Sequence, residues 1–187
     1  MIRQIVSGGQ TGVDRAALDV ALALGLRCGG WCPKGRQAED GTLAPRYPVI
    51  ETPSDDYAQR TAWNVRDADG TLVLTFGPPT GGTAQTIDVA IELGRPYLVV
   101  RLEEAPDLDA VRAWLRREQI YVLNVAGPRE SKQPGVYARA SAWLRRLLAA
   151  ARSAGRSSAS TMLFSLLGAV QDFAGSRPRD DDFTLMV

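Results

Sequence analysis

Strand-like and helix-like segments alternate along most of this chain, and this alternation restricts its possible folds more than any other feature. Short β-branched runs predict strands, and the apolar spacing between them predicts amphipathic helices. The expected strands are residues 3–7, 71–76, 96–101 and 121–125, and the expected helices are 13–24, 55–69, 83–93, 108–118 and one that opens at Pro134. This order predicts an α/β fold with a mostly parallel sheet and helices on both faces.

A less regular region separates the first helix from the second. Residues 29–48 are rich in Gly, Pro and Arg and show little periodicity, which predicts a long ordered loop of the kind that carries function. A short strand is expected at 48–51. Ser54 is the expected N-cap of the helix that follows.

Three glycine-rich loops, at residues 8–12, 77–82 and 126–135, each follow an expected strand. Parallel strands would bring all three to one edge of the sheet, where such folds bind ligands. The first two loops also lead into helices, whose N-terminal amides and dipole favour a phosphate. The alternatives are a tight turn with Thr11 as N-cap for the first loop, and a loop shaped by packing for the second.

Basic side chains near these loops point to anion binding. Only Lys34 and Lys132 are lysines among the 22 basic residues, and both lie in predicted loops. Trp31 is a candidate for stacking on a heterocycle, and Lys34 and Arg36 for neutralising a phosphate. The alternative is a surface loop anchored by Trp31.

The composition excludes several kinds of chemistry. The chain has no histidine, which rules out a Ser-His-Asp triad, a Cys-His pair and any histidine metal site. Two cysteines cannot form a four-thiolate zinc site, so no metal site is predicted. The net charge of +1 provides no overall basic field for nucleic acid.

Localisation is predicted to be cytoplasmic, with no membrane partner. The first residues, MIRQIVSGG, lack the apolar run of a signal peptide, and no segment approaches the length of a membrane span. Cys28 and Cys32 fit a reducing compartment better than a disulfide scaffold.

The C-terminal part differs in composition from the rest. We expect one domain over residues 1–150, a linker at 151–160 (ARSAGRSSAS) and an appendage at 161–187. The appendage resembles the end of bacterial metal-dependent serine phosphatases, with its acidic pair among Asp180, Asp181 and Asp182. The earlier carboxylates of those enzymes have no counterpart here, so an extra helix and strand is expected rather than an active phosphatase.

The motifs taken together resemble the molybdenum-cofactor carrier family, which belongs to a Rossmann-like group that includes the lonely-guy phosphoribohydrolases. The matching stretches are SGGQTGVDRAALD, GGWCPKGRQAEDG, YAQRTAWNVRDADGTLVL, GPPTGGT and LNVAGPRESKQPGVY. The resemblance runs from Ile2 to about Leu148, which is most of the chain.

The resemblance implies a Rossmann-like fold, a homo-oligomer (a tetramer) and binding of a molybdopterin-type cofactor without known turnover, with molybdoenzymes as the partners that receive it. It places the binding face on Gly8, Gly9, Gln10, Thr11, Gly12, Arg15, Lys34, Gly35, Arg36, Gly81, Gly82, Thr83, Ser131 and Lys132. No catalytic residue is implied.

One departure bears on enzymatic activity. The lonely-guy enzymes carry P-G-G-x-G-T-x-x-E, whereas here the second Gly-Thr is missing and no glutamate follows until Glu92. The leading hypothesis is therefore a carrier or storage protein for a phosphorylated pterin. The alternatives are a nucleotide hydrolase using Asp14, Glu39 or Asp40 as base, and a nucleotide-sensing regulatory domain.

Overall fold

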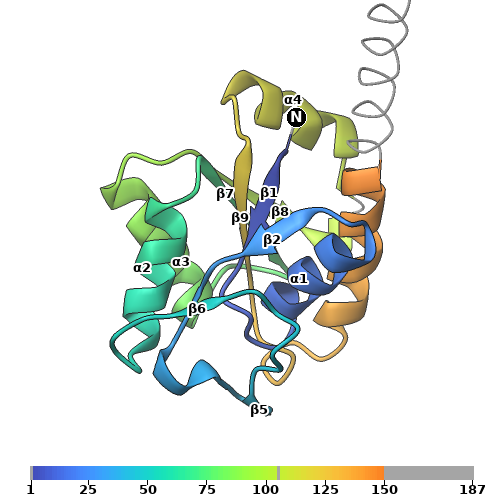
Figure 1. Ribbon diagram of the computed structural model, residues 1–187. Coiled ribbons are helices and arrows are strands. Elements are labelled where there is room, and N and C mark those ends of the chain that lie inside the picture. Colours follow the sequence, from blue (N-terminus) through green and yellow to red (C-terminus); the bar gives the residue numbers. More distant parts are fainter. Residues whose placement is uncertain (1, 105, 150–187) are drawn as a thin grey trace, which may run out of the picture. The chain divides into compact units, whose positions relative to one another are not determined.

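Five parallel strands form the central sheet of this protein, which a computed structural model describes over residues 2–104 and 106–149 (Figure 1). The strands are β1 (Gln4–Val6), β2 (Arg27–Gly29), β7 (Gly70–Thr75), β8 (Tyr97–Arg101) and β9 (Val122–Ala126). Their spatial order is β2-β1-β9-β7-β8, and every neighbouring pair is parallel. The predicted α/β, Rossmann-like fold with a mostly parallel sheet is thus confirmed.

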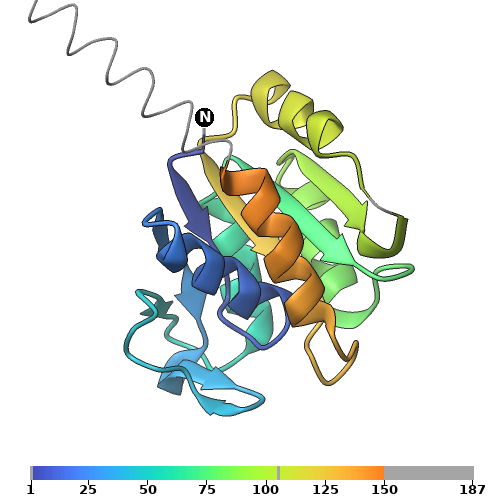
Figure 2. The same cartoon turned by 90° about the vertical axis from the view of Figure 1, so that its right-hand side faces the viewer.

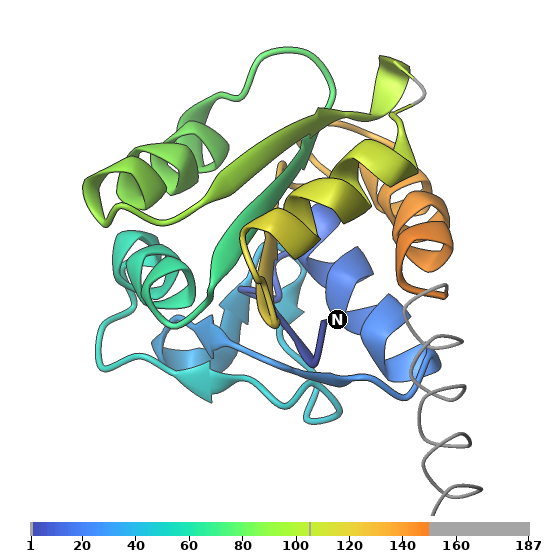
Figure 3. The same cartoon turned by 90° about the horizontal axis from the view of Figure 1, so that it is seen from above.

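Helices cover both faces of this sheet. They are α1 (Val13–Ala23), α2 (Tyr57–Arg66), α3 (Gly81–Glu92), α4 (Leu108–Arg117) and a helix over 136–149. Helices α1, α4 and 136–149 lie on one face, and α2 and α3 lie together on the other (Figures 2 and 3). The predicted linker at 151–160 and appendage at 161–187 lie outside the described residues.

The core explains why these segments adopt their structures. Strand β7, GTLVLT, is buried along its whole length, as expected for a central parallel strand that is covered on both faces. In α4, Val111, Trp114 and Leu115 are buried at the i, i+3, i+4 spacing of one helical face. These residues join one apolar cluster with α1, the central strands and helix 136–149.

Residues 29–48 contain more regular structure than expected. The edge strand β2 precedes β3 (Trp31–Cys32), which pairs in parallel with β6 (Ile50–Glu51). After the short 3-10 helix η1 (Lys34–Arg36), β4 (Gln37–Ala38) and β5 (Gly41–Thr42) form an antiparallel hairpin. Strands of two or three residues leave no detectable sequence period, and only pairing with a neighbour defines them.

The N-cap of α2 is Asp56, and the expectation of Ser54 is wrong. The Asp56 side chain accepts a hydrogen bond from the Ala58 amide at 2.9 Å. The Ser54 hydroxyl accepts instead from the Asp56 amide at 3.0 Å, so it supports the turn before the helix. Either residue type can cap a helix, and only the backbone geometry decides between them.

Replacing Asp56 by alanine is expected to lower the free energy of unfolding by about 1 kcal/mol, because one first-turn amide loses its acceptor. Asp55→Ala removes an exposed neighbouring carboxylate and should change the free energy of unfolding by less than about 0.5 kcal/mol. Urea denaturation of both variants checks this. Equal losses would show that charge near the helix start, rather than the cap, matters.

No helix within residues 2–104 and 106–149 is long and apolar enough to span a bilayer.

Candidate functional site

A cavity of about 230 Å³ opens where β1, β9 and β7 end. All three glycine-rich loops reach it, as the sequence predicts for parallel strands, and the start of α2 closes one side. Its lining residues are Gln10, Asp14, Tyr57, Arg60, Thr61, Thr80, Gly81, Gly82, Thr83, Gln85, Thr86, Ala126, Gly127, Pro128, Arg129 and Lys132. This cavity is the candidate functional site.

Positive charge predominates around the cavity. Three cationic side chains, Arg60, Arg129 and Lys132, line it, against the single carboxylate of Asp14. The guanidinium groups of Arg129 and Arg60 lie 4.8 and 5.7 Å from the centroid of the Tyr57 ring. An aromatic ring with two guanidinium neighbours suits a planar, anionic ligand.

A buried ion pair forms one wall of the cavity. Arg60 Nη1 lies 3.0 Å from Asp14 Oδ2, and the two side chains are 14% and 4% exposed. Burial raises the pKa of Asp14 above its ordinary value, although the charge and hydrogen bond of Arg60 oppose that shift. A β-carbon at position 8 would overlap the Arg60 guanidinium, so a larger residue there would displace that side chain from its ion pair.

Two buried donors at the cavity lack partners. Gln10 Nε2 and Arg60 Nε have no hydrogen-bond acceptor among the described residues. A buried polar group without a partner costs stability, so such groups call for a functional explanation. Both atoms are N–H donors in side chains that line the cavity, which favours a ligand rich in acceptors.

The N-terminus of α3 also faces the cavity. Its N-cap, Thr80, makes no side-chain cap hydrogen bond, so first-turn amides are left for other acceptors. A β-carbon placed at Gly81 or Gly82 would have no heavy atom within 4 Å. The helix start is therefore open to a phosphate, which the helix dipole also favours.

The structure brings some of the sequence-predicted site residues together at this cavity and places others elsewhere. Gln10, Gly81, Gly82, Thr83 and Lys132 line it. Gly8 and Gly9 are buried, Gly8 against Arg60 and Gly9 against Leu43. Ser131, next to Lys132, is hydrogen-bonded to Glu39.

Thr11, Gly12 and Arg15 line a second, more open cavity of about 410 Å³. Here Arg15 is bound on several sides: its Nη atoms lie 3.0 Å from the Asp40 carboxylate, and its Nε donates to the Gly9 carbonyl. The N-cap position of α1 is occupied by Gly12, which has no side chain to accept a capping hydrogen bond. Thr11 is therefore not the cap.

Lys34, Gly35 and Arg36 lie in η1 and line neither cavity. The Arg36 guanidinium is occupied in holding its own loop. It donates to the backbone carbonyls of Leu43, Ala44, Tyr47 and Val49.

Sequence reasoning missed Tyr57 and Arg60 as site residues. Both come from the first turn of α2, where the apolar pattern indicates only a helix. Their i, i+3 spacing places them on one face, and that was the one available signal. Arg129 lies in the third loop, which the sequence did mark.

The three carboxylates considered as catalytic bases have different environments. Only Asp14 lines the first cavity. Glu39 accepts hydrogen bonds from Thr11 and Ser131, and Asp40 binds Arg15. Across residues 2–104 and 106–149, no group of three or more His, Cys, Asp or Glu side chains is arranged to hold a metal ion.

Comparison with known proteins identifies the family. A crystal structure from Syntrophus aciditrophicus SB, named "Putative molybdenum carrier protein", is 43% identical, with a TM-score of 0.76, over 79% of this chain and 95% of that one. No curated protein gives a significant match. The profile of the circularly permutated YpsA SLOG family matches residues 5–148, and the chain therefore belongs to that family, which confirms the resemblance found in its sequence.

Proposed function

We propose that this protein binds and carries a phosphorylated, molybdopterin-type molybdenum cofactor in the cavity beyond β1, β9 and β7. The observation that carries the proposal is the convergence of cationic side chains and open α3 amides on one cavity. The name of the Syntrophus protein, molybdenum carrier, supports a molybdenum-related ligand.

The residues present suit the two ends of such a ligand. The start of α3, together with Lys132, offers amides and an ammonium for a phosphate. Tyr57 and the Arg129 guanidinium offer flat surfaces for a pterin ring. The cavity volume of about 230 Å³ falls below the roughly 300–1,000 Å³ of enclosed ligand sites, so part of the cofactor would extend into solvent.

The direct test is to purify the full chain from a host that makes molybdenum cofactor. After oxidation, bound pterin should appear by its fluorescence in stoichiometric amounts. The ligand-free protein should also take up cofactor released from a purified molybdoenzyme. A protein that carries no pterin and takes up none would overturn the proposal.

Lys132→Gln and Arg129→Gln are each expected to weaken pterin binding about tenfold, because each removes a cation that a phosphate or ring contacts in the cavity. Arg27→Gln, at the exposed first residue of β2 and outside the cavity lining, is the control and should bind as the wild type does. Lys34→Gln decides whether the site extends to η1, since a comparable loss there would place Lys34 at the ligand. Fluorescence titration measures all four.

Further parts of the proposal concern the cellular setting. The protein is proposed to act in the cytoplasm, as a homo-oligomer that hands its cofactor to molybdoenzymes. Both cysteines are free, which fits a reducing compartment. Light scattering gives the oligomeric state, and reconstitution of a cofactor-free molybdoenzyme tests delivery.

A nucleotide hydrolase is the second candidate, favoured by one observation. Asp14 is a buried carboxylate at the cavity whose pKa burial raises, which is a property of catalytic acids and bases. Incubation with nucleoside monophosphates would release free base, and Asp14→Asn would abolish that release. A nucleotide that raises the melting temperature without turnover would instead indicate a sensing role.

A further inference from the structure

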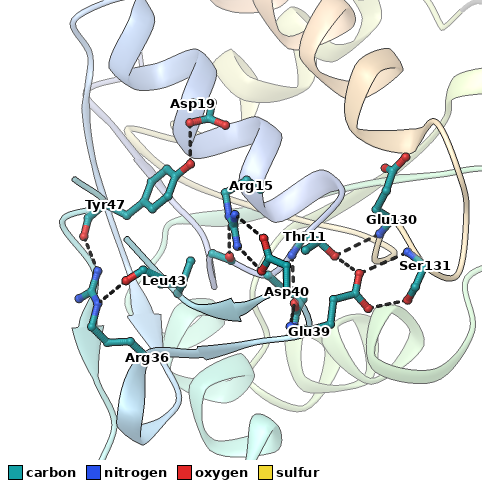
Figure 4. Close-up of polar contacts among 12 residues, drawn as sticks. Thr11, Arg15, Asp19, Arg36, Glu39, Asp40, Leu43, Tyr47, Glu130 and Ser131 are labelled. Carbon is teal, nitrogen blue, oxygen red and sulfur yellow. Dashed lines mark hydrogen bonds and ion pairs between the residues drawn. The ribbon is translucent and has the colours of Figure 1, made fainter. Parts of the chain in front are cut away.

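Glu39 lies in the turn of the β4–β5 hairpin, and it contacts two of the loops that line the cavity. Its carboxylate accepts from the hydroxyls of Thr11 and Ser131 and from the Ser131 amide (Figure 4). Its own amide donates to Gln10 Oε1 at 2.8 Å. One exposed residue is thus bound to both the first and the third glycine-rich loop.

The contact with Ser131 matters because of the turn in which Ser131 lies. The Lys132 amide donates to the Arg129 carbonyl at 3.1 Å, which closes a turn over residues 129–132. Arg129 and Lys132, the two cavity cations of the third loop, are the ends of this turn. Holding Ser131 between them therefore constrains the backbone from which both cationic side chains extend.

The Thr11 hydroxyl strengthens the same link. It donates to Glu39 and accepts from the Glu130 amide at 3.3 Å, so Glu39 and Thr11 together hold two successive amides of the turn. On the far side, the Glu130 carboxylate accepts from the amides of Gly135 and Tyr137 and ties the turn to the start of helix 136–149.

The contact with Gln10 orients a side chain of the cavity wall. Gln10 Oε1 accepts from two backbone amides, those of Glu39 and Thr11, at 2.8 and 3.0 Å. Since both partners are donors, the oxygen must face them and Nε2 must point the other way. Gln10 is 3% exposed, so this orientation cannot relax freely in water.

We propose that Glu39 is a positioning residue. Its hydrogen bonds hold the first and third loops together and thereby keep Arg129, Lys132 and Gln10 in the arrangement that binds the ligand. This role rests on the proposed function, because it concerns the same cavity. Glu39 lines neither cavity, so the role assigned to it is to position other residues and not to bind the ligand. Its alternative assignment as a catalytic base is not needed.

The ionisation of the Glu39 carboxylate favours this positioning role. Partial desolvation raises the pKa of Glu39, but hydrogen bonds from Ser131 and Thr11 more than offset this, and the pKa lies below its ordinary value. The Glu39 carboxylate is therefore ionised at neutral and mildly acidic pH. Its hydrogen bonds from Ser131 and Thr11 would weaken only as the pH falls through that lowered pKa.

The first test uses the ligand-free protein. Glu39→Ala should speed hydrogen exchange of the amides in the 129–132 turn, while Glu51→Ala should leave their rates unchanged. Glu51 is the matched control, since its carboxylate also accepts from a backbone amide, that of Gly35, but in a region away from the cavity. Melting temperatures confirm that both variants fold. Unchanged exchange rates in Glu39→Ala would overturn the positioning role of Glu39.

The second test measures binding of pterin released from a purified molybdoenzyme. Glu39→Ala should weaken binding about tenfold in the wild-type background and by much less in a Lys132→Gln background, because residues of one network are coupled. Equal losses in both backgrounds, or no loss, would overturn the positioning role alone. A wild-type chain that binds no pterin would overturn the proposed function and this role with it.

Discussion

Replacing Arg60 by methionine is expected to lower the free energy of unfolding by about 3–5 kcal/mol at neutral pH, because it leaves a buried charge without its partner. Asp14 Oδ2 lies 3.0 Å from Arg60 Nη1, and its side chain is only 4% exposed. Methionine replaces much of the aliphatic part of arginine. The loss should thus come from the Asp14 carboxylate, which stays almost fully buried without its partner.

The loss should shrink as the pH is lowered. Burial already raises the pKa of Asp14, and Arg60 opposes that shift, so without Arg60 the pKa rises further. In the unfolded chain the pKa of an aspartate is about 3.9. Between that value and the folded pKa, the folded state holds the proton more tightly, so stability increases as pH falls. Arg60→Met should therefore regain stability from pH 7 to pH 5.

Urea denaturation at both pH values, with Arg66→Met as control, measures this effect. Arg66 is in the same helix and pairs with Asp67, but these side chains are 49% and 40% exposed. An exposed pair contributes about 1 kcal/mol or less. A loss in Arg60→Met that does not depend on pH, or an equal loss in Arg66→Met, would contradict the importance of the buried pair.

Replacing Gly82 by alanine is expected to weaken pterin binding about 10- to 100-fold, the cost of losing a hydrogen bond to a charged group. A β-carbon at Gly82 has no protein atom within 4 Å, so the methyl group would enter the space that the phosphate needs in order to reach the α3 amides. The fold itself should tolerate the change.

Stability separates this effect from damage to the fold. Alanine is favoured over glycine within a helix by up to about 1 kcal/mol, so Gly82→Ala should melt at the same temperature as the wild type or higher. Asp88→Ala, at an exposed position of the same helix, is the control and should retain binding. If Gly82→Ala takes up pterin normally, the phosphate does not bind at the start of α3.

The elements that the sequence predicts correctly are those with a strong local signal. β7 extends from Gly70 to Thr75, within one residue of the expected strand, because a buried apolar run bounded by turns is visible in sequence. The edge strand β2 was missed. Its residues Arg27, Cys28 and Gly29 have no strand pattern, and they form a strand only through pairing with β1.

In the candidate site, too, the sequence indicates the features with a local pattern and misses those that depend on tertiary contacts. The glycine-rich loops were found because glycines between a strand and a helix are a local pattern. The Arg60–Asp14 pair joins residues 46 positions apart, and no local pattern relates them. Arg36 resembles an anion ligand in sequence, but in the structure its guanidinium is enclosed by backbone carbonyls. Whether a basic side chain can bind a ligand thus depends on whether other groups of the folded chain already occupy its donors.

The sequence by itself determined the fold class and the edge of the sheet where the loops meet, because periodicity and short glycine motifs act within a few residues of the chain, and its motifs together resemble those of the family. Only the tertiary structure decided which side chains share the cavity, that Asp14 is buried against Arg60, and that Glu39 holds the first and third loops. Burial and charge pairing depend on distances in space between segments far apart in sequence, and the packing of helices on the sheet sets those distances.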